Sequence, residues 1–463
     1  MKKNLLFILF LIVSSVQAQD YWTEKPTGQP AAAIGVTSIS YVDANTVWLN
    51  NNNGSTTSTI EIRRYSKSLD GGLTWTTAPI DLGASSADLQ ISCIDAVSAD
   101  VAYASVFGSN GATGGIWKTT DGGATWTRQS TASFNSPESF PNLVHFFNEN
   151  EGVCMGDPDV NGFEIYTTSN GGANWVRKTG LPATLGANEY GYSNQFDAYG
   201  NSIWIGTGFG RILRSTDKGL TWTAYQTPLD DFGGQGNGTQ SGDFAFEDEN
   251  NGLLISSDYQ CFKTTDGGAT WTNVPYTPNV PGEIPAVGII RGQRIANIPG
   301  LPNTYVCVGT DVINDDIQTA RGSSYTTDNG VTWIDINDNP DTNYVDGTTI
   351  KFYSQEVGLA GGFSTSPTVG GVFKWNNEPL LAIKNYLKEH PFNAYIAQNT
   401  LEVIGADITN VTLFDVSGKE VSNTNFASVK NTSMNVSNLN TGVYLVKVTN
   451  NAGATATIKV IKN

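Results

Sequence analysis

The sequence predicts an all-β protein built from a repeated unit, and three observations lead to this prediction. An octet of the form Ser/Thr-x-Asp-x-Gly-x-Thr-Trp, first met at residues 68–75, occurs in six near-copies. The composition favours strands and turns over helices, with Gly 50, Trp 11, Tyr 18 and Phe 20 in 463 residues. Apolar runs of strand length precede the octets, at a spacing of roughly forty to sixty residues, which is typical of a repeat architecture.

The first residues have the pattern of a secretory signal peptide. Lys2 and Lys3 precede an apolar run at residues 5–13, and small residues stand at the −3 and −1 positions of a cleavage site after Ala18. We therefore expect residues 1–18 to direct Sec export and to be removed. No later stretch offers about 20 apolar residues, so the sequence predicts no membrane span.

Charge and cysteine usage narrow the partners and cofactors. The net charge of −17 argues against nucleic acid and against anionic membrane surfaces. The four cysteines each lie in an apolar run and form no Cys-x-x-Cys pair, which predicts buried thiols, with disulfides as the alternative in an exported chain. The four are Cys93, Cys154, Cys261 and Cys307. With His145 and His390 as its two histidines, the chain has few ligands for a metal, and we expect none.

The octet predicts a tight turn between two strands. Its carboxylate accepts backbone N–H groups across the turn, its glycine supplies a positive φ, and a strand begins at the tryptophan. We interpret the acid position as structural in every copy, including the third, where asparagine replaces aspartate. These positions are Asp70, Asp121, Asn170, Asp217, Asp266 and Asp328.

Seven apolar runs, with about four strands per unit, predict a seven-bladed β-propeller over residues 19–376 rather than a solenoid. The seventh unit reaches Trp375 and has no octet. Tyr21, Trp22 and Thr23 resemble the strand opening that follows an octet. We therefore expect the N-terminal strand to complete the last blade and close the ring, which would remove an exposed sheet edge.

The composition changes after the last repeat. Residues 377–392 are richer in Leu, Lys, Glu and Ala, and they predict a linker with one short helix. Residues 393–463 alternate apolar and polar side chains over several strand-length segments separated by turns. This pattern predicts a small C-terminal β-sandwich.

The octet is identified as the Asp-box, so residues 19–376 resemble the Asp-box β-propeller families: sialidases, sortilin-type receptors, xyloglucan-cleaving glycosidases and photosystem-assembly-factor-like propellers. The resemblance implies the fold and says little about function, because in these families the box lies at blade hairpins away from the ligand-binding mouth.

Residues 393–463 resemble the type A C-terminal sorting domain of the Bacteroidetes type IX secretion system. The match rests on residues 411–421, 439–448 and 458–462. It implies that the outer-membrane translocon recognises this domain after Sec export and that the propeller is cargo for the cell surface or the medium. A general adhesive β-sandwich is the alternative reading.

Two functions of different class remain open for the propeller. The Phe/Tyr-Arg-Ile-Pro segment that sialidases carry is absent. The fold could gather five arginines, Arg211, Arg214, Arg291, Arg294 and Arg321, and we interpret Arg211 and Arg214 as structural. A glycoside hydrolase needs two carboxyl groups about 5 to 9.5 Å apart across a cleft, and the sequence does not pair its loop acids. We therefore favour a non-catalytic glycan- or protein-binding module over a sialidase-like or xyloglucanase-like hydrolase. The candidate ligand-binding acids are Asp157, Asp159, Asp231, Asp243, Asp258 and Asp311.

One segment leaves calcium open as a cofactor. Residues 335–346 place oxygen-bearing side chains at alternating positions, as a calcium loop does. Pro340 stands where such a loop needs glycine, and Asp346 stands in place of the usual glutamate. We therefore expect no cofactor and keep calcium as the alternative.

Overall fold

The structure is a computed structural model in which the chain divides into two compact units, Met1–Glu378 and Pro379–Asn463. It describes residues 21–55, 62–84, 86–109, 112–136, 138–186, 189–233, 241–275, 290, 294–309, 322–336, 345, 347–377, 380, 392–397, 399–405, 407–451, 453 and 455–462. The predicted signal peptide, most of the predicted linker with its helix, and most of the calcium-type segment lie outside this part of the chain.

The first unit contains five separate sheets of four antiparallel strands each. They are β6 (Leu89–Ala96), β7 (Ala102–Gly108), β8 (Gly115–Thr119) and β9 (Thr127–Arg128); β10 (Pro141–Phe146), β11 (Gly152–Asp159), β12 (Gly162–Thr168) and β13 (Val176–Arg177); β14 (Gly191–Tyr199), β15 (Ser202–Thr207), β16 (Arg211–Ser215) and β17 (Thr223–Gln226); β18 (Gly242–Phe246), β19 (Gly252–Ser256), β20 (Cys261–Thr264) and β21 (Thr272–Asn273); and β22 (Arg294–Asn297), β23 (Tyr305–Gly309), β24 (Gly322–Thr326) and β25 (Ile334–Asp335).

An eight-stranded sheet completes this unit, and it consists of two four-stranded groups joined where Gly35 pairs with Phe363. One group is β2 (Ile34–Tyr41), β3 (Val47–Asn53), β4 (Arg64–Ser68) and β5 (Thr76–Pro79). The other is β26 (Thr349–Phe352), β27 (Gly358–Ser366), β28 (Val369–Trp375) and β1 (Trp22–Pro26). The all-β propeller fold is confirmed. Seven blades remain a prediction, which this grouping of the described strands fits.

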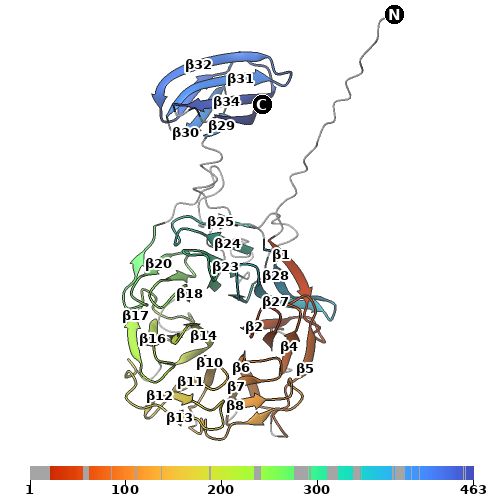
Figure 1. Cartoon of the computed structure of the whole chain (residues 1–463), viewed down its shortest axis with the longest axis vertical. Helices are drawn as coiled ribbons and strands as arrows, with labels where there is room; N and C mark the ends of the chain where they lie inside the picture. Colours follow the sequence, from red (N-terminus) through yellow and green to blue (C-terminus); the bar gives the residue numbers. More distant parts are fainter. Residues whose placement is uncertain are drawn as a thin grey trace, which may run out of the picture. The chain divides into compact units, whose positions relative to one another are not determined.

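The four-stranded groups follow one another around a ring (Figure 1). The first strands of the groups are the inner strands β2, β6, β10, β14, β18, β22 and β26. Each inner strand contacts the next, and β26 contacts β2, so the inner strands surround a central channel. The apolar core lies between successive groups. For example, Trp48 and Tyr65 of one group pack with Ile91 and Trp117 of the next.

The N-terminal strand closes the ring, as the sequence predicted. β1 pairs antiparallel with β28, from Trp22 opposite Trp375 to Pro26 opposite Gly371. The Trp22 indole N–H donates to Ser323 Oγ at 2.9 Å, and its ring lies 4.9 Å from the Trp375 ring. Because the first and last strands of the propeller share one sheet, this group is complete only when both ends of the propeller sequence have folded.

Each octet forms the predicted turn. In the second copy, Asp121 Oδ1 accepts hydrogen bonds from Thr119 Oγ1 at 2.8 Å and from the Thr125 N–H at 2.9 Å. Asp121 Oδ2 accepts from Thr125 Oγ1 at 2.6 Å. Asn170 keeps the first two of these bonds, and Asn174 in place of threonine has no hydroxyl for the third. The turn also bonds to its own blade, because the Gly122 N–H donates to the Asp100 carbonyl in the turn between β6 and β7.

Substitution of the octet acid tests how much its hydrogen bonds stabilise the fold. Threonine and backbone donors hold the Asp121 pKa at about 2, so the charged form stabilises the fold above the unfolded value of 3.8, and this stabilisation is lost as the pH falls toward 2. We expect Asp121→Ala to lower the melting temperature by a few degrees at pH 7 and Asp121→Asn to lower it less, because the amide oxygen still accepts. Melting curves at pH 7 and pH 3 provide the measurement. An Asp121→Asn effect as large as that of Asp121→Ala would contradict the turn role.

The second unit is a small sandwich of two antiparallel sheets. One sheet is β29 (Phe392–Ala397), β30 (Thr400–Gly405) and β33 (Thr432–Asn435). The other is β32 (Glu420–Val429), β31 (Ile408–Asp415), β34 (Gly442–Asn450) and β35 (Thr455–Lys462). Leu401, Val411, Leu413 and Val446 form the core between the sheets and are fully buried.

The four cysteines are buried free thiols, as predicted. Burial raises the pKa of Cys93 and of Cys261 to about 12. At neutral pH these thiols are therefore protonated, and they fill the core as small apolar groups.

Candidate functional site

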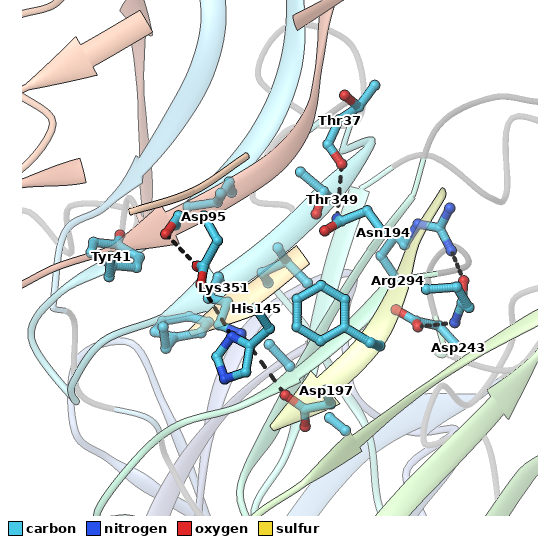
Figure 2. Close-up of a pocket in the computed structure, with 18 of the residues that line it drawn as sticks. Thr37, Tyr41, Asp95, His145, Asn194, Asp197, Asp243, Arg294, Thr349 and Lys351 are labelled. Carbon is cyan, nitrogen blue, oxygen red and sulfur yellow. Dashed lines mark hydrogen bonds and ion pairs between the residues drawn. The ribbon is translucent and has the colours of Figure 1, made fainter. Parts of the chain in front are cut away.

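A polar pocket of about 290 Å³ lies in the central channel, and all seven inner strands line it (Figure 2). The residues of β2, β6 and β10 that line the pocket belong to the last part of each strand. It therefore extends toward the end of the channel where the inner strands turn into the second strands. The Asp-box turns bond to those same connecting turns. The resemblance implied a ligand mouth away from the Asp-boxes. This pocket instead lies toward the end of the channel at which the Asp-boxes stand.

Two rings of side chains form the pocket wall, because alternate residues of a strand face the same side. We call the ring nearest the connecting turns the turn ring; its members are Ser40, Asp95, His145, Asp197, Ala245, Ala296 and Lys351. The middle ring lies two residues earlier on each strand and consists of Ser38, Cys93, Leu143, Gln195, Asp243, Arg294 and Thr349. Every turn-ring member lines the pocket, but only the last four members of the middle ring do. The pocket is therefore deepest on the side of β14, β18, β22 and β26.

The acids of both rings bind the backbone of the next blade. An inner strand is the edge of its sheet, so its outward N–H groups need acceptors from elsewhere. The carboxylates supply them: Asp95 accepts from the Phe146 N–H at 2.6 Å, Asp197 from the Phe246 N–H at 2.8 Å, and Asp243 from the Ile295 N–H at 3.1 Å. Ser40 and Ser38 do the same for the Ala96 and Ile94 N–H groups. These side chains hold successive blades together.

Each of these carboxylates also has a side-chain partner. Asp95 lies 3.3 Å from His145 Nδ1 and accepts from Ser40 Oγ at 2.8 Å. Asp243 accepts from Gln195 Nε2 at 2.7 Å, and the carbonyl oxygen of Gln195 accepts from Arg294 at 3.2 Å.

The third carboxylate has a looser partner. Asp197 Oδ1 accepts from the Ala198 N–H at 2.9 Å and lies 3.9 Å from Lys351 Nζ. With this pair, each acid of the pocket has a basic or imidazole side chain assigned to it, directly or through Gln195. The acids of the channel are therefore paired with Lys351, Arg294 and His145, of which His145 carries a charge only when protonated.

Burial and partners move the three acids in different directions. Burial raises the pKa of Asp197 and of Asp243, and Lys351 and Arg294 offset only part of this effect. Burial would also raise the pKa of Asp95, but the charge and hydrogen bond of His145, with bonds from Phe146 and Ser40, bring it below the usual value. The causes are thus burial and structural contacts, and the pKa shifts do not by themselves identify a catalytic acid.

One hydrogen-bond donor remains available in the pocket. Lys351 Nζ has no acceptor closer than Asp197 at 3.9 Å among the contacts of the described residues, and its side chain is 40% exposed. The Phe196 ring centroid lies 5.9 Å from this ammonium and 5.5 Å from the imidazole of His145. An acceptor-bearing ligand would satisfy the Lys351 ammonium.

The candidate acids do not gather in one place. Asp243 lines the channel pocket, whereas Asp311 lies outside the described residues. Asp231 is fully buried and accepts from the Tyr192 hydroxyl, and Asp258 accepts from Gln260 within its own turn. Arg177 holds Asp159 through two bonds of 2.7 and 2.8 Å.

Asp157 is a buried acid that joins two blades. Asp157 Oδ1 accepts from Asn142 Nδ2 and from the Gly191 N–H, both at 3.0 Å. Burial raises its pKa to about 7 and is the largest effect. The hydrogen bond from the Gly191 N–H lowers the pKa, and the charge of Glu164 raises it. Asp157 does not line the channel pocket.

The raised pKa of Asp157 predicts how stability depends on pH. The folded chain holds the proton between about 3.8 and 7 while the unfolded chain releases it, so the free energy of unfolding falls as pH rises through this window. The rise corresponds to about 4 kcal/mol at most. We expect Asp157→Asn to be more stable than the wild type at pH 8, with a gain that shrinks toward pH 4.

Urea unfolding at several pH values measures this effect, and Asp159→Asn is the matched control. Hydrogen bonds from Arg177 hold the pKa of Asp159 below its usual range, so that variant should lose stability at pH 8. An Asp157→Asn variant that is less stable than the wild type at pH 8 would contradict the buried-acid account.

The sequence arguments singled out five arginines and missed most of the pocket. Arg211 pairs with the fully buried Glu189 at 2.6 Å, and Arg214 donates to two carbonyls, so both are structural as predicted. Arg294 enters the pocket, and the other two, Arg291 and Arg321, lie outside the described residues.

The missed residues Asp95, His145, Asp197 and Lys351 share one signal. Each stands one or two residues before the end of an inner strand. An alignment of the units on these strands would have placed them in one ring.

The described residues also bear on the predictions about a membrane span and a metal. No helix there is long and apolar enough to cross a membrane. Among the same residues, no group of three or more His, Cys, Asp or Glu side chains is arranged to hold a metal ion. Calcium at the segment of residues 335–346 remains a proposal, because residues 337–344 and Asp346 lie outside the described part.

Comparison with solved structures defines the class of the first unit as a β-propeller. A structure of YCF48 bound to D1 peptide superposes with a TM-score of 0.52 at 15% identity and covers 78% of this chain and 98% of that one. YCF48 from Cyanidioschyzon merolae gives the same TM-score at 18% identity, with 78% and 100% coverage. At these identities the likeness concerns the fold alone.

The C-terminal region is identified more closely. Residues 393–463 match the family model of the secretion system C-terminal sorting domain. The chain therefore carries a type IX sorting domain, and its destination is the cell surface or the medium.

Similarity to curated proteins covers only part of the chain. The xyloglucanase Xgh74A of Acetivibrio thermocellus is 31% identical over 140 residues, which is 27% of this chain and 16% of that protein. A xyloglucanase of a Paenibacillus species is 29% identical over 191 residues, 36% of this chain and 17% of that protein. The chain thus spans about a sixth of the length of these relatives.

Proposed function

We propose that the propeller is an exported, non-catalytic binding module that takes a glycan or a protein segment at the pocket in its central channel. One observation carries this proposal: the carboxylates of the pocket all serve the fold. Asp95, Asp197 and Asp243 each accept a backbone N–H from the neighbouring blade. A general acid or a nucleophile needs a carboxyl group free to meet the substrate, and these groups are already engaged.

The pocket supports binding in other respects. It is concave, all seven inner strands line it, and it has a few polar groups beside aromatic rings, as ligand sites do. Export by the type IX route places such a module outside the cell, where glycans and surface proteins are the accessible partners. The solved YCF48 propeller with a bound D1 peptide supports the view that this fold can accept a peptide segment.

A glycoside hydrolase is the second candidate, and the partial likeness to xyloglucanases favours it. Outside the channel, the best-placed acids are Asp157 and Glu164, whose pKa values burial raises. Glu164 is 1% exposed and surrounded by Ser139, Tyr166 and Arg177, so a sugar cannot reach it. The described residues therefore support a binding function better than hydrolysis.

Turnover assays separate the two candidates. The full chain is incubated with xyloglucan and with sialyl-lactose, and products are followed by mass spectrometry. We expect no products above those of a heat-unfolded sample. We also expect Asp243→Asn and Asp197→Asn to keep ligand binding within about threefold, since the amide oxygen still accepts the backbone N–H. Product release that either substitution abolishes would overturn the proposal.

A further inference from the structure

We infer that the channel pocket binds an uncharged saccharide, a terminal sugar or a short oligosaccharide, and that it does so through the turn ring. This inference rests on the proposed function and names its ligand class. The first argument is that every acid of the pocket already has a partner. Asp95, Asp197 and Asp243 face Lys351, Arg294 and the imidazole of His145, each acid with its own partner.

A charged ligand would meet a like charge in this pocket. A ligand carboxylate beside Lys351 would lie next to Asp197, and a ligand ammonium beside Asp197 would lie next to Lys351, because these two groups are 3.9 Å apart. The attraction of such a ligand to one member of the pair is therefore largely cancelled by its repulsion from the other, while the ligand charge loses its hydration. A neutral ligand has no charge to dehydrate, so the pocket favours it over acidic and basic ligands.

Hydroxyl groups suit the hydrogen bonds that remain. The Lys351 ammonium, whose side chain is 40% exposed, has no acceptor within hydrogen-bond distance among the contacts of the described residues. A sugar hydroxyl can accept from this ammonium and donate in turn to an oxygen of the wall. The exposed Tyr353 ring lies 5.9 Å from the Tyr41 ring, and Phe196 lies beneath Lys351, which provides aromatic faces for the apolar side of a sugar ring.

The turn ring leaves room for such a ligand on one side. Ala245 and Ala296 stand between Asp197 and Lys351 in the order of the ring, where the other members have polar side chains. Next to these two small residues, the pocket also includes Asp243 and Arg294 of the middle ring. A volume of about 290 Å³ is at the lower end of the range for small-molecule sites, which suits a chain end better than a long stretch of polymer.

Calorimetric titration of the full chain tests the inference with three probes of different charge. The probes are xyloglucan heptasaccharide as the neutral one, trigalacturonate as the acidic one and chitotriose freed of its acetyl groups as the basic one. We expect the neutral probe to bind at least tenfold more tightly than either charged probe. Lys351→Met should weaken it about tenfold, and Ala296→Leu should abolish binding by filling the pocket.

Matched controls guard against general loss of fold. Lys218→Met removes a lysine from the fourth Asp-box turn, and Ala124→Leu places leucine where the first and fourth boxes already have Leu73 and Leu220. Both should bind the neutral probe as the wild type does, and melting curves should show all variants folded. A charged probe that binds as tightly as the neutral one, or neutral binding unchanged in Ala296→Leu, would overturn the ligand class. Cleavage of the heptasaccharide would instead overturn the proposed function.

Discussion

Removal of residues 393–463 is expected to leave a folded propeller that no longer reaches the cell surface. The reason is that these residues are the type IX sorting domain, whereas the ring closes entirely within the first unit. Surface labelling of cells that express the shortened chain should fall to the background level. The label should instead appear in the periplasmic fraction.

A full-length chain with the pocket-filling substitution Ala296→Leu is the control, and it should be exported like the wild type. Loss of surface signal together with proteolysis of the propeller would indicate misfolding and would require a second readout, the melting curve of the shortened chain. An undiminished surface signal would show that export does not depend on the last domain.

Loss of the N-terminal strand is expected to have the largest effect on stability. Trp22 pairs opposite Trp375, packs against its ring and bonds to Ser323 of β24. Trp22→Ala should therefore lower the free energy of unfolding by about 3 to 5 kcal/mol, the usual cost of removing a buried tryptophan side chain. Deletion of residues 21–23 should cost more, because the last blade would also expose an unpaired edge.

Thr23→Ala on the same strand is the matched control. The Thr23 hydroxyl donates to Asn376 Oδ1 at 2.8 Å in an exposed position, so its loss should cost no more than about 1 kcal/mol. Urea unfolding of the three variants gives the comparison. Equal stabilities for Trp22→Ala and Thr23→Ala would mean that β1 does not hold the ring closed.

The repeat made most of the fold predictable. The Asp-box combines an acid, a glycine and a tryptophan in one local turn, so its geometry follows from eight consecutive residues, as the bonds of Asp121 show. Ring closure was predictable for a similar reason. The unit that ends at Trp375 lacks an octet, and Trp22 offers the missing strand.

The pocket was far less predictable, because its residues come from seven strands that the ring alone brings together. Of the five candidate acids that the structure describes, only Asp243 lines it. Loop acids attracted attention because they look exposed in the sequence, yet Asp231 is fully buried. Asp95 and Asp197 lie within apolar strands, and nothing local indicates that their carboxylates bind the next blade.

The central claim is that the channel binds a neutral saccharide without cleaving it, and a crystal structure of the full chain with xyloglucan heptasaccharide tests it most directly. The account predicts an intact sugar in the central channel, with a hydroxyl group within hydrogen-bond distance of Lys351 Nζ. Saccharide density outside the channel, or a cleaved glycosidic bond within it, would contradict the account.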